Sequence, residues 1–150
     1  MKPDIVTLAK GLGGGLPIGE FICGEKTENT LSAGMHGSTF GANPVVCAGA
    51  CEIISRVSSP DFLAEVNKKG EYLISKVMAS NPAKVKAVRG RGLMIGFAVE
   101  GNPKDILHYC ADNGLLVLTA GSDVIRLLPP LTISYDEIDK GVEILAKALN

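Results

Sequence analysis

The sequence places one lysine between an apolar run and a cluster of glycines, a combination that can make an amine reactive. Ile5 to Ala9 is mostly apolar, Lys10 follows it directly, and glycines occupy positions 11, 13, 14 and 15. Such a run, bounded by turn formers, predicts a buried strand. A lysine at its end would be poorly solvated, and burial penalises the charged form of an amine. Lys10 is therefore a candidate nucleophile for a Schiff base with an aldehyde, and the glycines would let the backbone approach a bulky group.

Two other interpretations of this segment remain open on the residues alone. Lys10 could be a solvated lysine at a strand end, followed by an ordinary glycine turn. The glycines could also form a phosphate-binding loop. The order of residues argues against that loop, because its lysine follows the glycines and precedes Ser or Thr, whereas Lys10 precedes them.

Three segments together resemble the fold-type I, class III aminotransferases, which use pyridoxal 5'-phosphate as cofactor. They are PDIVTLAKGLGGGLPIG at positions 3–19, HGSTFGANP at 36–44 and VIRLLPPLTI at 124–133. Their order and spacing agree with the family over essentially the whole chain. The resemblance implies an α/β fold, in which 1–82 is the trailing part of the large cofactor-binding domain and 83–150 is a small α+β domain.

The resemblance also implies roles for four residues. Lys10 would be the Schiff-base lysine, serving as cofactor anchor and as general acid and base. Thr39 would bind the cofactor phosphate of the neighbouring subunit, and Ser38 would contact the substrate. Arg126 would pair with a glutamate or with a substrate carboxylate, although a solvent-facing arginine is the alternative. Ala42 stands where the family more often has glycine, and a positive φ there would cost energy.

The third segment looks most like the acetylornithine branch of the family. The implied reaction is acetylornithine:2-oxoglutarate amino transfer in arginine biosynthesis, by an enzyme that is at least a dimer. Ornithine, succinylornithine and 4-aminobutyrate remain alternative amino donors. A non-catalytic folding or association module is the alternative from another class.

The same resemblance predicts that this chain is incomplete as a catalyst. In the family, the aspartate on the pyridine nitrogen, the ring-stacking aromatic and a glycine-rich phosphate turn all precede the cofactor lysine. The sequence therefore looks like the C-terminal portion of such an enzyme, and we expect it to have no useful transaminase activity alone.

Composition gives few indications of other partners. A formal net charge of -1 suggests neither a nucleic-acid footprint nor an anionic membrane surface. No apolar run is long enough to span a bilayer, and the first residues lack a signal-peptide pattern. Four cysteines without a CxxC pair and only two histidines make a metal site unexpected. Free cysteines fit a reducing cytoplasm.

Capping signals predict most of the elements that must position these residues. Asn43-Pro44 predicts a helix over 44–57, apolar nearly all round and therefore buried. Ser59-Pro60 starts another helix to about residue 79, and Ser134 with Glu137 forms a capping box for a last helix. Other expected elements are strands at 5–9, 18–23, 115–118 and 124–128, helices at 25–31 and 103–113, and two adjoining strands within 85–99. Arg89 and Arg91, on the first of those two strands, are interpreted as structural or surface residues.

Overall fold

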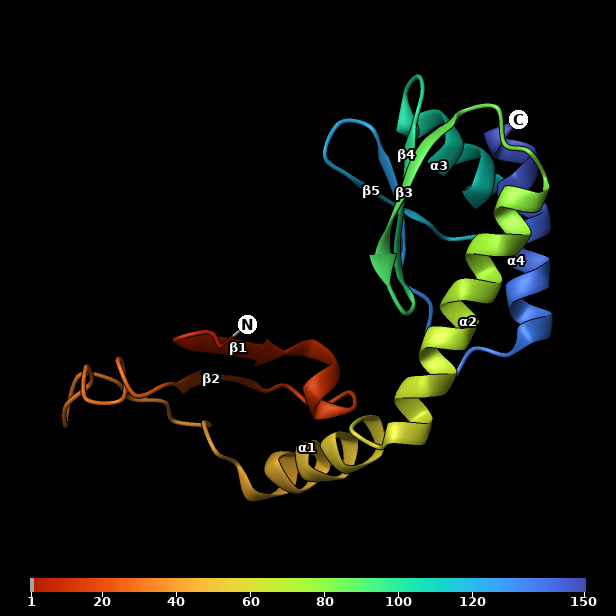
Figure 1. Ribbon diagram of the computed structural model, residues 1–150. Helices are drawn as coiled ribbons and strands as arrows, with labels where there is room; N and C mark the ends of the chain where they lie inside the picture. The colour runs from red at the N-terminus through yellow and green to blue at the C-terminus, as the bar shows by residue number, and fades with distance from the viewer. Residues whose placement is uncertain (1) are drawn as a thin grey trace. The chain divides into compact units, whose positions relative to one another are not determined.

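A computed structural model describes residues 2–150 of the chain (Figure 1). Its described residues form two compact units, the N-terminal unit in residues 2–62 and the C-terminal unit in 63–150. This division falls before the expected domain boundary at residue 82, because the long helix α2 (Pro60–Ala79) packs within the C-terminal unit. How the complete enzyme divides into domains stays a prediction.

The N-terminal unit is a two-stranded hairpin with one helix. β1 (Ile5–Ala9) and β2 (Gly19–Cys23) pair antiparallel, and the short 3-10 helix η1 (Lys10–Gly13) begins where β1 ends. After a long loop, α1 (Pro44–Val57) starts at the predicted cap: the Asn43 Oδ1 accepts hydrogen bonds from the next two free backbone N–H groups. Both strands and the helix were predicted from the sequence, and their positions are confirmed.

The predicted burial of these elements is wrong for this chain. β1 alternates between exposed and half-buried residues, and Ile5 is 53% exposed. In α1 only Ala50 is buried, and Val45 is 72% exposed. A two-stranded sheet and one helix cannot enclose a core between them. The apolar faces read from the sequence are present, but no further layer in residues 2–62 covers them.

The expected helix over residues 25–31 is also wrong. These residues form separate turns, in which Thr27 and Glu28 both donate their N–H to the Gly24 carbonyl. The Thr27 Oγ1 donates to the Asp4 carbonyl at 2.9 Å. This side-chain bond ties the turn to the start of β1 and competes with a helical hydrogen-bond pattern.

The C-terminal unit is an antiparallel sheet packed on one side by helices (Figure 1). The strand order is β3-β4-β6-β5. The strands are β3 (Val85–Arg91), β4 (Met94–Val99), β5 (Leu118–Ala120) and β6 (Val124–Leu127), and the remaining helices are α3 (Pro103–Asp112) and α4 (Tyr135–Leu149). Fully buried side chains include Val77, Leu93, Ile95, Phe97, Val99, Cys110, Ile125, Ile138, Leu145 and Leu149.

Helix ends in this unit follow the sequence signals, with one consequence for β5. The predicted capping box before α4 is present. Gly114, with φ 85°, ends α3, and the Leu115 N–H donates to the Cys110 carbonyl at 2.8 Å. This is the Schellman pattern. It uses the residues expected to start a strand at 115, so the strand begins only at Leu118.

Candidate functional site

Lys10 is held at the junction between β1 and η1. Its backbone has φ 57°, in the left-handed region that non-glycine residues rarely adopt. Its side chain is exposed and makes no ion pair or hydrogen bond with the described residues. The predicted desolvation of this amine is therefore not supplied by residues 2–150. Backbone strain of this kind is often found at functional positions, where surrounding structure imposes it.

The glycine loop after Lys10 packs against α1. Leu12 and Gly13 are buried. Gly14 has φ 59°, and a Cβ built on it would lie 3.0 Å from the side chain of Ile53 on α1. The glycines thus provide both the positive φ and the close approach that the sequence suggested, and the bulky group they approach in this chain is a helix side chain. This packing fixes the direction in which the chain leaves Lys10.

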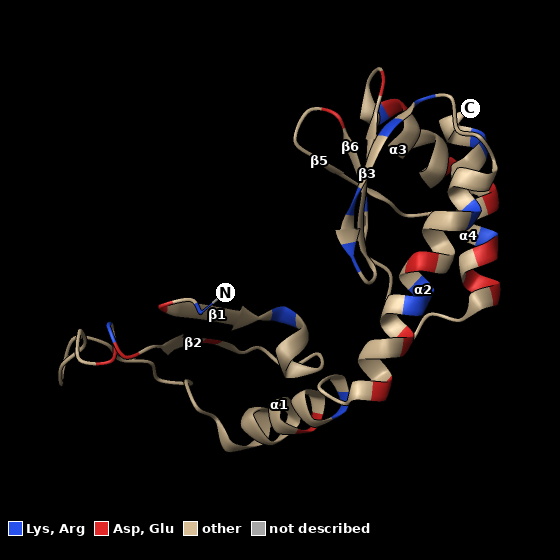
Figure 2. Ribbon diagram, in the orientation of Figure 1, with Lys and Arg blue, Asp and Glu red and all other residues tan. Residues whose placement is uncertain are grey.

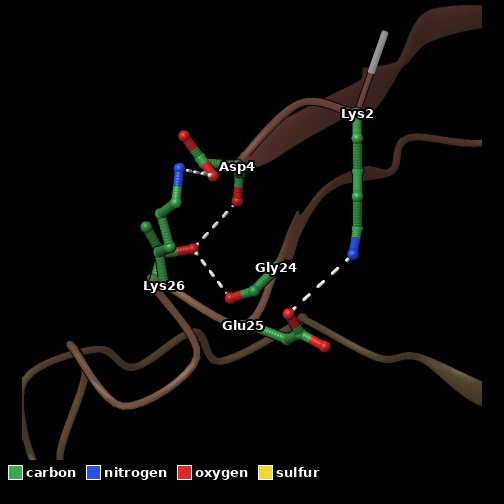
Figure 3. A network of polar contacts seen from close by, with 6 residues as sticks. Lys2, Asp4, Gly24, Glu25 and Lys26 are labelled. Atoms are coloured by element: carbon green, nitrogen blue, oxygen red, sulfur yellow. Dashed lines mark hydrogen bonds and ion pairs between the residues drawn. The ribbon is translucent and has the colours of Figure 1, made fainter.

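The opposite end of the hairpin is closed by polar contacts (Figure 3). The Gly24 N–H donates to the Asp4 carbonyl at 2.8 Å, while the Lys26 Nζ lies 3.2 Å from the Asp4 carboxylate. Lys2 and Glu25 form a looser, exposed pair at 3.8 Å. Because the strands are antiparallel, this network marks the end of the hairpin away from Lys10.

Ser38 and Thr39 lie in the exposed loop that leaves the hairpin at that far end. The Gly41 N–H donates to the Ser38 Oγ at 3.0 Å. Ala42 has φ 55°, the positive φ that costs energy for a residue other than glycine. The contacts within the described residues do not bring Lys10 together with Ser38 or Thr39. All of these residues belong to the N-terminal unit.

Arg126 belongs to the other unit, on β6, and strand pairing places it between Gly96 of β4 and Leu118 of β5. It is half-buried, and its Nε is a buried nitrogen without a hydrogen-bond partner among the described residues. A buried donor without a partner is costly. Arg126 therefore does not simply point to solvent, and it does not form an ion pair within residues 2–150.

Arg89 is exposed, as its interpretation as a structural or surface residue implies, but the sequence did not indicate its relation to Arg126. Register places Arg89 opposite Gly96, on the same row of the sheet as Arg126, and both arginines line one shallow depression. The signal was available in the expected turn near Gly92, because the position of a hairpin turn sets which residues face each other. Combined with the pairing of β4 and β6, it would have placed two arginines side by side around a glycine.

The described residues include groups of the kinds that bind the aldehyde and the phosphate of pyridoxal phosphate. A free amine at Lys10, a hydroxyl at Thr39 and exposed loop N–H groups are the donor types that suit an aldehyde and a phosphate. They fit the two ends of pyridoxal phosphate. Among residues 2–150 no group of His, Cys, Asp and Glu side chains is placed to hold a metal ion, and no helix is long and apolar enough to cross a membrane.

Comparison with known proteins gives consistent matches along the whole chain. Acetylornithine aminotransferase from Haemophilus ducreyi is 49% identical over 152 residues, covering 100% of this chain and 38% of that protein. The Lactococcus lactis subsp. lactis protein of the same name is 45% identical, covering 99% and 40%. This chain therefore spans about two fifths of the length of the curated relatives it matches.

Solved structures of aminotransferases also match this chain along nearly its whole length. An N-acetylornithine aminotransferase from Stenotrophomonas maltophilia matches with a TM-score of 0.85 and 36% identity, over 99% of this chain and 40% of that one. The ornithine aminotransferase of Toxoplasma gondii matches with a TM-score of 0.85 and 28% identity, over 98% and 37%. The sequence profile of the class-III aminotransferases matches residues 1–149. The α/β chain, with its lysine between strand and glycine loop, thus belongs to the class-III aminotransferase family of pyridoxal-phosphate-dependent enzymes.

Proposed function

We propose that this chain is the C-terminal part of an acetylornithine:2-oxoglutarate aminotransferase of arginine biosynthesis. The observation that carries the proposal is the free, exposed amine of Lys10, held at a strand end by a packed glycine loop, in a chain 49% identical to an acetylornithine aminotransferase. The proposal includes a cytoplasmic location, which the four free cysteines support.

Lys10 is the group that anchors the cofactor and moves the proton. Its Nζ would hold the cofactor by condensing with the aldehyde carbon, with loss of water, and the same amine, when free, would take a proton from the substrate carbon that carries the amino group. The bound cofactor supplies the electron sink for that carbon. Because the amine must be neutral to act, and is exposed in this chain, the proposal requires other parts of the complete enzyme to cover it.

Thr39 and Ser38 act toward a second subunit in this proposal. Their loop leaves the hairpin at the end opposite Lys10. Both side chains are exposed, and no hydrogen bond within the described residues joins either of them to Lys10, which supports a role toward a partner's cofactor. A homodimer, with Thr39 as phosphate ligand and Ser38 as substrate contact across the interface, follows as part of the proposal. Arg126 is the proposed ligand of a substrate carboxylate.

The experiment compares Lys10→Ala with Lys26→Ala in the complete enzyme that carries this chain. Lys26 is an exposed lysine of the same unit that pairs with Asp4. We expect Lys10→Ala to lower turnover of acetylornithine by at least about 10³-fold, and Lys26→Ala to leave it unchanged. Borohydride treatment of the wild-type enzyme should fix a pyridoxyl group on the peptide that contains Lys10. Retained turnover in Lys10→Ala would refute the assignment.

The exposed apolar surface of the N-terminal unit favours a second candidate, a non-catalytic association module. Phe40 is 85% exposed, Val45 72% and Met35 64%. Apolar surface of this kind promotes association. Sedimentation velocity on the 150-residue chain should show concentration-dependent association under either function. Cofactor-dependent amino transfer by the complete enzyme would exclude the non-catalytic one.

A further inference from the structure

One row of the C-terminal sheet carries two arginines separated by a glycine. Arg89 of β3 faces Gly96 of β4, and Gly96 faces Arg126 of β6. Side chains at paired positions point to the same face of a sheet. The two guanidinium groups therefore share one face, and the position between them has no side chain. Figure 2 shows basic residues along β3 without acidic residues beside them on that strand.

Gly96 leaves a narrow lane between the two arginine side chains, bordered by the Val124 side chain. A Cβ built at Gly96 would lie 3.8 Å from the Arg89 Cγ and 3.2 Å from the Val124 Cγ1. The stem of Arg89 thus runs along the glycine, on the side that faces Arg126. The lane forms the floor of a depression of about 530 Å³, which both arginines line together with Met94 and Asp123.

Neither arginine has an anionic partner among the described residues. Arg89 and Arg126 take part in no ion pair, and Asp123, at the rim, pairs with neither. The Arg126 Nε is buried and unpaired. Two like charges on the same row of the sheet repel each other, and a buried guanidinium N–H without an acceptor is unfavourable. A single carboxylate in the lane over Gly96 would relieve both.

We propose that Arg89 is a second substrate-binding residue, which holds a substrate carboxylate jointly with Arg126, and that Gly96 keeps the lane open for that carboxylate. The inference rests on the proposed aminotransferase function and deepens it. The guanidinium groups present fork-shaped pairs of N–H donors, which match the two oxygens of a carboxylate. The ligand class is a carboxylic acid substrate, with 2-oxoglutarate as the case to test.

The experiment uses the complete enzyme and compares Arg89→Gln with Arg91→Gln. Arg91 is an exposed arginine on the same strand, two positions along, and does not line the depression. We expect Arg89→Gln to raise KM for 2-oxoglutarate about 10- to 100-fold, the range of a lost charge-assisted hydrogen bond, with kcat nearly unchanged. Arg91→Gln should change neither. Arg89→Lys should recover part of the loss.

Two further variants test the shared carboxylate. If Arg89 and Arg126 hold one carboxylate, the Arg89→Gln/Arg126→Gln double variant should lose less than the product of the single losses. Gly96→Ala places a methyl group in the lane and should weaken binding of glutarate, measured by the glutarate-induced rise in Tm of the cofactor-free enzyme. Glutarate binding by Arg89→Gln should fall in the same assay.

The outcomes separate this inference from the function on which it rests. If Arg89→Gln matches Arg91→Gln in KM and in glutarate binding while Lys10→Ala abolishes turnover, the role of Arg89 is refuted alone. If Arg89→Gln lowers Tm or kcat but leaves KM for 2-oxoglutarate unchanged, the role of Arg89 in substrate binding is also refuted, because Arg89 would then bind a carboxylate of the protein. If Lys10→Ala keeps full turnover, the aminotransferase proposal fails, while glutarate binding still reports on Arg89.

Discussion

Replacing Gly70 by alanine sets helix propensity against a close backbone contact. Gly70 lies inside α2, where glycine is about 1 kcal/mol less favourable than alanine. Propensity alone therefore predicts a more stable protein. A Cβ at this position, however, would lie 2.1 Å from the Gly92 carbonyl oxygen and 2.6 Å from its carbonyl carbon. Gly92 is in the turn between β3 and β4, with φ 54°.

The loss of stability in Gly70→Ala can be worked out from the displacement that the new Cβ forces on the Gly92 backbone. Real Cβ contacts are essentially never shorter than 3.0 Å, so the Gly92 backbone must retreat from α2 by about 0.9 Å. Overpacking costs about 1–3 kcal/mol, and the high end applies because backbone, rather than a flexible side chain, has to yield. Less the propensity gain, we expect a net loss of about 2 kcal/mol, or roughly 10 °C in Tm for a domain of this size.

Tyrosine fluorescence and far-UV circular dichroism of the chain during denaturant unfolding measure this change. All three tyrosines, at positions 72, 109 and 135, lie in the C-terminal unit, and the chain has no tryptophan. Gly141→Ala is the matched control, since a Cβ there meets only the Leu115 Cδ1 at 3.5 Å. It should stabilise α4 by about 0.5–1 kcal/mol. A Gly70→Ala protein as stable as wild type would refute the contact between α2 and the turn.

Two further changes test local features. Ala42→Gly should relieve the cost of the positive φ of 55°. Less the entropy that glycine loses on folding, the start of α1 should gain about 0.5 kcal/mol, seen as slower amide exchange at Val45. Faster exchange at Val45 would contradict the positive φ at Ala42. The Asp139 carboxylate accepts hydrogen bonds from Lys76, which has the larger effect, and from Tyr72, and both lower its pKa. The stability that these contacts contribute is therefore present above the ordinary pKa near 3.8 and is lost as the pH falls below it. The Tm of the wild-type chain should therefore fall between pH 6 and pH 3, and the Tm of Asp139→Asn should depend less on pH over this range. An equal pH dependence of Tm in the two proteins would exclude a contribution of Asp139 to stability.

Local chain chemistry made much of the fold predictable. Asn43 before Pro44 fixed the start of α1, and Ser134 with Glu137 fixed the start of α4, because a cap and its N–H partners lie within three residues. The position of Lys10 at a strand end followed in the same way from its immediate neighbours. Signals of this range depend on nothing beyond a short segment, and they hold whether or not the rest of an enzyme is present.

Errors occurred where a residue depends on distant parts of the chain. The segment at 25–31 was expected to be helical, yet a hydroxyl bond from Thr27 to Asp4 holds it in turns. Burial of β1 and α1 was inferred from their apolar residues, but burial requires a second surface. The relation of Arg89 to Arg126 could not be read from the sequence for the same reason, because only strand pairing brings the two residues to one row.

The features that this chain leaves unsatisfied occur in both units and differ in chemistry. In the N-terminal unit, Lys10 has an exposed amine whose proposed role requires desolvation, and Val45, at the start of an apolar helix, is largely exposed. In the C-terminal unit, the Arg126 Nε is buried without an acceptor. A stand-alone domain would be expected to resolve most such features internally. An apolar face is covered by apolar surface, whereas a guanidinium N–H needs an acceptor such as the substrate carboxylate proposed above. The exposed face of α1 and the unpaired nitrogen of Arg126 therefore call for partners of different chemistry.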